Sequence, residues 1–383
     1  MFKLNLKIAL RNLWKNKGIT AINVGGLAIA LAAFILVVMY ATYETGFDQK
    51  NPNYDNIYVV GVTYPEFKTN YVAAPLATAI KKKFLEVEAA GLITGSSFEL
   101  TIKNGNNTLF TKNILVADYG AAKILNIKPN GGLVKPQGDV ERLIYLSEES
   151  MQTLFPNKRD DKPEMVGLGA SNSGITGTIA GAIKNNPQSN FTFDGVSIAA
   201  ELGKNDNYEM NNYSIYLRLR PETNVELLEQ KITHLYRAEL LKSKKVTDVK
   251  STSIFLDPLA NLHLKPKAGN DAPYKILIAL STLGILILVI ACINFTNLSI
   301  AQAAKRGKEV GIKKVMGAFR YQLTKQFLVE IFMQCLVALI LALMLAELVL
   351  PSFNNLFQVR LSIWHFDNGL FWQLPLILGV ITF

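Results

Sequence analysis

The residue types that most often carry out chemistry are scattered along this 383-residue chain. The histidines, His234, His263 and His365, have no carboxylate or cysteine partner at the spacing of a metal site. The glycine-rich stretch 167–174, GLGASNSG, lacks the terminal G-K-[ST] of a phosphate-binding loop, and the chain contains no Walker A or G-x-S-x-G motif. We therefore predict no catalytic, cofactor-binding or metal-binding residues and no enzymatic activity.

One segment could instead make a specific contact with another protein. Residues 305–320, KRGKEVGIKKVMGAFR, are basic and lie between two long apolar runs. Read as one helix, this segment and its continuation carry an apolar stripe made of Ile312, Val315, Met316, Phe319 and Leu323. Two interpretations remain open here. The segment is either a basic amphipathic loop that lies on the lipid surface and fixes the topology, or a helix that docks on a cytoplasmic partner.

The charge distribution favours a membrane protein over a nucleic-acid-binding one. Half of the residues are hydrophobic, and the formal net charge is +10. The excess of basic residues lies in the two segments 1–17 and 305–325, each of which borders an apolar run. Basic residues beside membrane spans collect on the cytoplasmic side, so this distribution needs no nucleic-acid partner.

Four apolar runs are candidate membrane spans, at 19–43, 276–304, 326–350 and 370–383. At 1.5 Å per helical residue, the first three can cross about 30 Å of hydrocarbon. The fourth stops at the last residue of the sequence, so we expect the chain to be a truncated product or a fragment of a longer permease. Small residues on the first run predict close helix packing there: Gly25, Gly26, Ala28, Ala32 and Ala33.

The segment before the first span predicts an amphipathic helix in the lipid headgroup layer. Basic side chains recur every four residues at Lys3, Lys7, Arg11 and Lys15, and Trp14 is a suitable interfacial anchor. The alternative is the basic start of a signal peptide. We favour an uncleaved span with a cytoplasmic N-terminus, because the following apolar run is too long for a signal peptide and does not end in an A-x-A-like site.

Polar residues inside the other spans have two possible roles. Asn294, Thr296, Asn297, Ser299 and Gln302 either mark the cytoplasmic end of the second span, which we favour, or form hydrogen bonds between helices. In the third span, we interpret Glu330 and Glu347 as carboxylates that reach a membrane interface, rather than as functional groups.

Residues 44–273 form a polar block that must lie across the membrane from the basic N-terminus. Strand patterns at 57–64, 143–146, 175–183 and 214–219 alternate irregularly with helix patterns, which predicts an α+β domain in two lobes. Pro75 opens one helix, Ser147 caps a second that ends at Phe155, and Asn224 begins a third. The predicted fold class is an α-helical membrane protein with about four spans and a large extracytoplasmic α+β domain.

Several motifs together resemble the permeases of the FtsX/MacB family of ABC transporters, most of all those of Bacteroidetes-type bacteria. The residues from Arg306 to Ala318, RGKEVGIKKVMGA, resemble the family's motif after the second span, and 326–330, QFLVE, resembles its entry into the third. The segments 9–17, 22–28 and 258–264 are further matches. Phe319 departs from the small polar residue that often follows the motif.

The resemblance implies one span, a periplasmic MacB-like domain and three further spans. It also implies that the loop at 305–325 couples to a cytoplasmic ABC ATPase through Glu309, Gly311, Ile312, Lys313, Lys314, Gly317 and Ala318. The remaining boundaries are an interface helix at 1–17 and an outer loop at 351–369.

By this resemblance the chain is a multi-pass permease subunit of the bacterial inner membrane. It would couple ATP hydrolysis by a separate subunit to movement of its periplasmic domain, in export, efflux or envelope handling. The expected partners are the ATPase, a second permease copy or half, membrane lipids and a periplasmic or outer-membrane protein. The alternative is a receptor without transport activity, in which the outer domain senses a ligand and the basic segment signals inward.

Overall fold

The chain folds into two units in the computed structural model. The structure describes residues 17–94, 98–105, 107–137, 142–156, 164–168, 175–186, 188–200, 202–203, 207–208, 210–242, 249–317, 319–364 and 379. The helical unit comprises Met1–Thr45 and Tyr274–Phe383, and the polar domain comprises Gly46–Pro273. The predicted interface helix, with Lys3, Lys7, Arg11, Trp14 and Lys15, lies outside the described residues, as does nearly all of the fourth apolar run.

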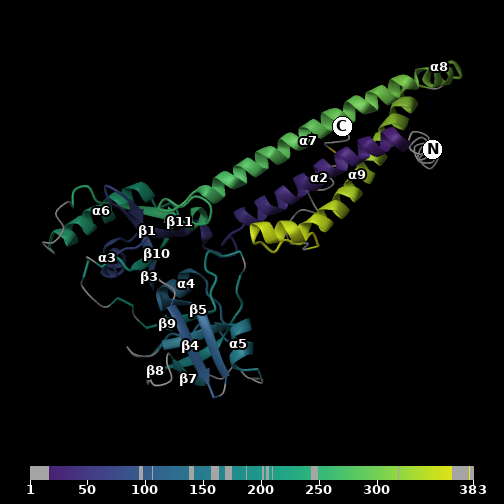
Figure 1. Ribbon diagram of the computed structural model, residues 1–383. Helices are drawn as coiled ribbons and strands as arrows, with labels where there is room; N and C mark the ends of the chain where they lie inside the picture. The colour runs from purple at the N-terminus through teal and green to yellow at the C-terminus, as the bar shows by residue number, and fades with distance from the viewer. Residues whose placement is uncertain are drawn as a thin grey trace. The chain divides into compact units, whose positions relative to one another are not determined.

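Three long helices dominate the helical unit (Figure 1). They are α2 (Lys17–Thr45), α7 (Ala272–Lys305) and α9 (Arg320–Phe357), and each is long and apolar enough to cross a membrane. The short helix α8 (Gly307–Val315) lies between α7 and α9 in the sequence. Each long helix satisfies its own backbone hydrogen bonds, which is what a lipid environment requires.

α9 extends beyond the span predicted at 326–350. The helix begins six residues before that span, and the predicted outer loop at 351–369 is helical as far as Phe357, with Pro351 inside the helix. Packing explains why the proline does not end it. The rings of Phe353 and Phe357 lie 6.0 and 4.9 Å from that of Tyr40 in α2, which anchors the last turn of α9. Gln358, in a left-handed conformation with φ 53°, then ends the helix.

α2 packs against α9 through small residues. Ala338, Ala342 and Ala346 recur every four residues on α9 and are fully buried, and Ala28 and Ala32 of α2 are buried as predicted. Alanines at this spacing leave a flat stripe on which another helix can lie closely. Gly25 and Gly26 do not take part, because a Cβ atom added at either position meets no atom within 4 Å.

The first lobe of the polar domain is a split β-α-β sheet. Its elements are β1 (Ile57–Thr63), α3 (Pro75–Lys83), β3 (Val87–Thr94), β10 (Tyr213–Leu219), α6 (Val225–Lys242) and β11 (Ser253–Pro258). The strand order is β11-β1-β10-β3 with antiparallel neighbours, and the two-residue strand β2 (Lys68–Thr69) pairs with β1. This is the ferredoxin-like β-α-β-β-α-β arrangement, with the second lobe inserted between its second and third strands.

The second lobe is a closed ring of six strands. They are β4 (Phe98–Asn104), β5 (Asn107–Asp118), β6 (Arg142–Ser147), β7 (Glu164–Leu168), β8 (Ile175–Ile183) and β9 (Gly195–Ala199). Pairing runs from β5 through β4, β7, β8 and β6 to β9, and β9 pairs back with β5. A closed ring leaves no exposed sheet edge.

Three buried clusters hold the domain together. One lies between the first-lobe sheet and α3 and α6, and it includes Ile215 and Leu217 of β10. A second lies on the opposite face of that sheet, where Tyr216 meets α4 (Tyr119–Ile124) and strands of the ring. The third fills the ring and lies against α5 (Glu148–Leu154). The first-lobe sheet is therefore buried on both faces, so the second cluster joins the two lobes.

The local elements that the sequence predicts are confirmed where a pattern or cap is strong. β8 has the predicted bounds 175–183, and Ser147 caps α5 by accepting a hydrogen bond from the N–H of Ser150 at 3.1 Å. Asn224 caps α6 through the N–H of Leu227 at 3.0 Å. Two 3₁₀ turns, Tyr54–Asn56 and Leu259–Asn261, complete the described elements.

We predict that Gly91→Ala destabilises the polar domain by about 3 kcal/mol. A Cβ atom at this position of β3 would collide with the backbone nitrogen of Ala121 in α4, and backbone cannot move aside as a flexible side chain can. Gly167→Ala on β7 is the matched control, since its Cβ would meet nothing within 4 Å. Urea denaturation of the full chain in detergent, followed by circular dichroism, measures both. Equal midpoints for the two variants would contradict the prediction.

Candidate functional site

The basic segment is not one helix, as the sequence suggests, but a break, a short helix and a turn. α7 ends at Lys305, and Arg306 lies at the break that precedes α8. α8 ends at Val315, and Gly317 follows with a φ of +91°, which favours glycine. Phe319 is then the extended residue before α9. Glycines at positions 307 and 317 thus divide a segment whose charges and apolar residues suit a single helix.

The end of α8 carries exposed apolar side chains. Val315 is 90% exposed, Met316 78% and Phe319 73%, and Ile312 is also exposed. We call these four residues the apolar tip. Leu323, the fifth member of the predicted stripe, is instead buried in α9, because the turn at Gly317 separates it from the others. Large apolar side chains grouped on a surface in this way typically mark a contact with a protein or a membrane.

Basic residues flank the apolar tip in the sequence. Lys308, Lys314 and Arg320 are exposed, and Lys313 is half-buried. Of the other predicted coupling residues, Glu309 and Gly311 lie in α8, while Ala318 lies outside the described residues. The structure therefore brings most of the predicted residues together on one short helix and its turn.

The two predicted coupling glycines differ in whether the backbone conformation requires a glycine. A Cβ atom added at Gly311 meets nothing within 4 Å, so the chain itself leaves this position open. Gly317 also has open space, but its positive φ makes any other residue strained. A substitution at Gly311 therefore tests contact with a partner, whereas one at Gly317 also disturbs the turn.

A buried ion pair fixes the break between α7 and α8 to α9. Nη1 of Arg306 lies 2.8 Å from both carboxylate oxygens of Glu330, and the two side chains are only 16% and 7% exposed. Glu330, which we expect near a membrane interface, thus has a charge partner from the same chain beside it. Glu347, by contrast, is exposed.

Polar groups continue from this ion pair along the helices. A cavity of about 380 Å³ lies between α7 and α9 beside the pair, and it is lined by Gln302 and Gln334 among others. On the α2 side, Nδ2 of Asn23 lies 3.4 Å from both the carbonyl oxygen of Phe295 and the hydroxyl of Ser299. We expect the polar residues near the end of the second span to mark its cytoplasmic end or to form hydrogen bonds between helices. For Ser299, the structure shows a hydrogen bond between helices.

The ion pair is the part of the site that sequence reasoning missed. From the sequence, Arg306 and Glu330 belong to two separate motifs, and Glu330 is also a charge near a span end, but neither pattern pairs them. The signal that could have joined them is a basic residue at a helix break followed by a carboxylate one turn or two inside the next span, since such a carboxylate needs a partner.

Together these features define a membrane protein with a large extracytoplasmic α+β domain and a basic, partly apolar helix between two spans. Comparison with known families identifies it further. Residues 20–235 match the MacB-like periplasmic core domain, and residues 281–383 match the FtsX-like permease C-terminal domain. The chain belongs to the FtsX/MacB family of ABC transporter permeases.

Individual relatives are distant. The chain is 23% identical to the macrolide export ATP-binding/permease protein MacB of Photorhabdus laumondii over 59% of its own length and 34% of the relative's. It is 25% identical to MacB of Neisseria gonorrhoeae over 38% of its length and 21% of the relative's. The chain thus spans about a third or less of the curated relatives that it matches.

Solved structures give weak overall superpositions. A domain of a putative permease from Porphyromonas gingivalis is 21% identical, with a TM-score of 0.43 over 55% of this chain and 93% of that one. The periplasmic region of MacB from Actinobacillus actinomycetemcomitans is 12% identical, with a TM-score of 0.36 over 61% of this chain and 97% of that one.

We predict that Arg306→Met destabilises the helical unit by about 3–5 kcal/mol, because it leaves the carboxylate of Glu330 buried without its charge partner. Glu330→Gln should cost less, since Arg306 is the more exposed of the two. The double variant Arg306→Met, Glu330→Met should recover most of the loss. Unfolding by SDS in mixed micelles measures all three. Additive losses in the double variant would contradict this prediction.

Proposed function

We propose that this chain is a permease subunit that couples ATP hydrolysis by a separate cytoplasmic ABC ATPase to movement of its polar domain in the periplasm. In this arrangement the N-terminus and α8 are cytoplasmic, α2, α7 and α9 cross the inner membrane, and a second permease copy or half completes the assembly. The movement of the polar domain would drive export, efflux or envelope handling.

The observation that carries the proposal is the apolar tip at the end of α8 and in the turn after it, together with the basic residues that flank it in the sequence. Val315 and Met316 are far more exposed than side chains of their kind usually are. A protein partner accounts for this pattern better than lipid does, because the tip is small and the open space at Gly311 allows close approach by another backbone. Membership of an ABC permease family supports an ATPase as that partner.

The ion pair gives the docking helix a mechanical role. Because Arg306 is held by Glu330, α8 is fixed at its start to α9 as well as to α7. A displacement of α8 by an ATPase would then move both helices together, since a buried pair with two short contacts resists separation. Without the pair, the break at Arg306 could act as a hinge and absorb the movement.

We predict that Val315→Asp weakens association with the ATPase at least about tenfold, which corresponds to about 1.4 kcal/mol. A carboxylate at the centre of an apolar contact must be buried without a partner when the subunits meet. Val315 is 90% exposed in this chain, so the fold itself should be unaffected. Co-purification of the full chain with a candidate ABC ATPase of the same organism, quantified by titration in detergent, measures the effect.

The matched control is Leu85→Asp, which changes an 86% exposed apolar residue of the polar domain in the same way. It should leave ATPase association unchanged. Gly311→Trp should reduce association, with no loss of thermal stability in the chain alone. If Val315→Asp and Gly311→Trp both retained full association, α8 would not be the docking site. Failure of the unaltered chain to bind any ATPase would overturn the proposed function itself.

A further inference from the structure

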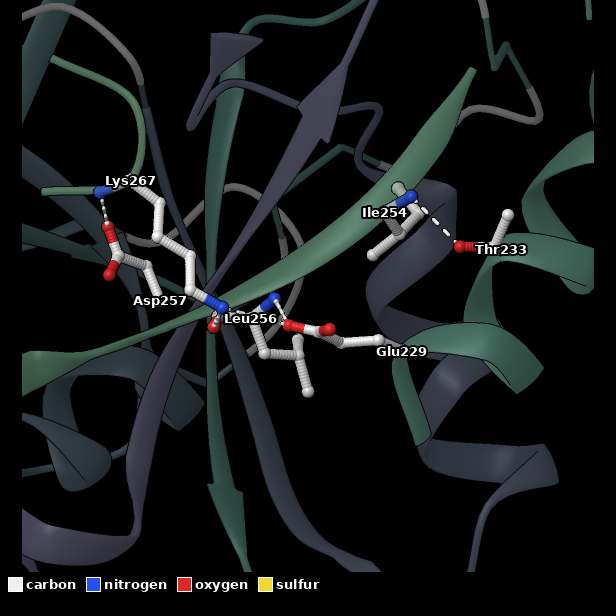
Figure 2. Close-up of polar contacts among 6 residues, drawn as sticks. All are labelled: Glu229, Thr233, Ile254, Leu256, Asp257 and Lys267. Atoms are coloured by element: carbon white, nitrogen blue, oxygen red, sulfur yellow. Dashed lines mark hydrogen bonds and ion pairs between the residues drawn. The ribbon is translucent and has the colours of Figure 1, made fainter. Parts of the chain in front are cut away.

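The strand from which the chain leaves the polar domain has an unusual edge. β11 is the first strand of the sheet order and pairs with β1 on one side. The backbone groups on the other side of an edge strand normally remain open to solvent or to another strand. Here several of them are taken by side chains, as Figure 2 shows for the middle of the strand.

Three side chains of α6 act as a substitute for a neighbouring strand. Glu229 accepts a hydrogen bond from the N–H of Leu256 at 2.7 Å, and Thr233 accepts one from the N–H of Ile254 at 2.9 Å (Figure 2). One turn further along α6, Nε of Arg237 donates to the carbonyl oxygen of Thr252 at 2.7 Å.

The spacing of these contacts follows from the geometry of helix and strand. Four residues of an α-helix rise about 6 Å, and two residues of an antiparallel strand rise about 6.8 Å. The spacing along the helix therefore matches the spacing along the strand. As a result, residues 229, 233 and 237 of α6 contact residues 256, 254 and 252 in turn, and the two segments run in opposite directions. The match fixes α6 and β11 as one mechanical element.

Lys267 joins this element from the segment that leads to α7. Its Nζ donates to the carbonyl oxygen of Leu256 at 2.9 Å and lies 3.1 Å from Oε1 of Glu229. Its backbone N–H donates to Oδ2 of Asp257 at 2.7 Å (Figure 2). Burial raises the pKa of the fully buried Asp257 carboxyl, while the N–H and the charge of Lys267 favour its ionised form.

The chain upstream of Lys267 is held in a different place. The ring of His263 stacks on that of Phe47 with centroids 3.4 Å apart, and the N–H of Lys265 donates to the carbonyl oxygen of Asn261 at 2.8 Å. Phe47 lies two residues after the end of α2. A force applied to the chain near α7 can thus be transmitted in two ways. It can reach the α6–β11 element through Lys267, or it can reach Phe47, near the point where the chain enters the polar domain.

We infer that Lys267 is the positioning residue through which a displacement of α7 reaches the polar domain. This inference rests on the proposed function. Only residues 268–271 separate Lys267 from the start of α7, so the link between them is short, at most about 14 Å when fully extended. Loss of the Lys267 side-chain contacts would leave only the backbone hydrogen bond to Asp257 and the stack at Phe47 to hold this segment, so less of the movement would reach α6 and β11.

The test compares Lys267→Met with Lys231→Met in the full chain, assembled with its ATPase in nanodiscs. Lys231 is the matched control, because it also forms an ion pair that involves the first lobe, with Glu86 at 2.6 Å. The two lysine side chains are 42% and 41% exposed, respectively, for Lys231 and Lys267. Hydrogen exchange of residues 253–271 and of α6 is measured by mass spectrometry, without nucleotide and with a non-hydrolysable ATP analogue.

Without nucleotide, Lys267→Met should raise exchange across 262–271 at least about tenfold, while Lys231→Met leaves it unchanged. With the analogue, the nucleotide-dependent change in β11 and α6 should fall at least about fivefold in Lys267→Met only, with ATPase association intact. Glu229→Gln, which keeps an acceptor for Leu256 but removes the charge facing Lys267, should give an intermediate response if Lys267→Met folds poorly.

A wild-type nucleotide response in both Lys267→Met and Glu229→Gln would overturn the inference and leave the proposed function standing. Failure of the proposed function would give a different result from failure of the inference alone. If the unaltered assembly bound its ATPase but showed no nucleotide-dependent exchange anywhere in the polar domain, the coupling function would fail, and the inference with it.

Discussion

The need to satisfy backbone hydrogen-bonding groups governs both units of this protein. In the helical unit the long helices satisfy these groups internally, as a hydrocarbon environment demands. In the polar domain the same need is met by strand pairing, by closure of the six-stranded ring and by the side chains of α6 along β11. The β11 edge is thus capped by side chains, which protects it from pairing with another chain and also ties it to a helix.

Where the backbone pattern is interrupted, the protein has its candidate sites. The break at Arg306 and the turn at Gly317 set α8 apart from its neighbours, and an ion pair compensates for the lost continuity. The irregular segment after β11 is likewise fixed by Lys267 rather than by regular structure. In both places the contacts of a charged residue hold a segment that no continuous helix or strand holds. Such contacts can be removed one at a time by mutation without a change in the fold class.

Sequence reasoning succeeded where one local signal decides the outcome. Long apolar runs, the strand pattern at 175–183 and the cap at Ser147 each fix an element from neighbouring residues alone. It failed where distant residues decide. Pro351 should end a helix, but Phe353 and Phe357 pack on Tyr40 and carry the helix past it. The pairing of Arg306 with Glu330 depends on α9 returning beside α7, which no periodicity within either segment reveals.

The same distinction explains the uneven result at the candidate sites. The predicted coupling residues are contiguous in sequence, so a motif can name them, whereas the turn at Gly317 and the exposure of the apolar tip follow only from the structure. The cap on β11 has a periodic signal, because Glu229, Thr233 and Arg237 recur every four residues on one face of α6. That signal has no meaning until β11 is known to lie beside the helix. A polar face on an amphipathic helix normally faces solvent, and here it supports a sheet edge instead. The contacts that tie β11 to α6 are thus among those that local sequence patterns conceal most effectively.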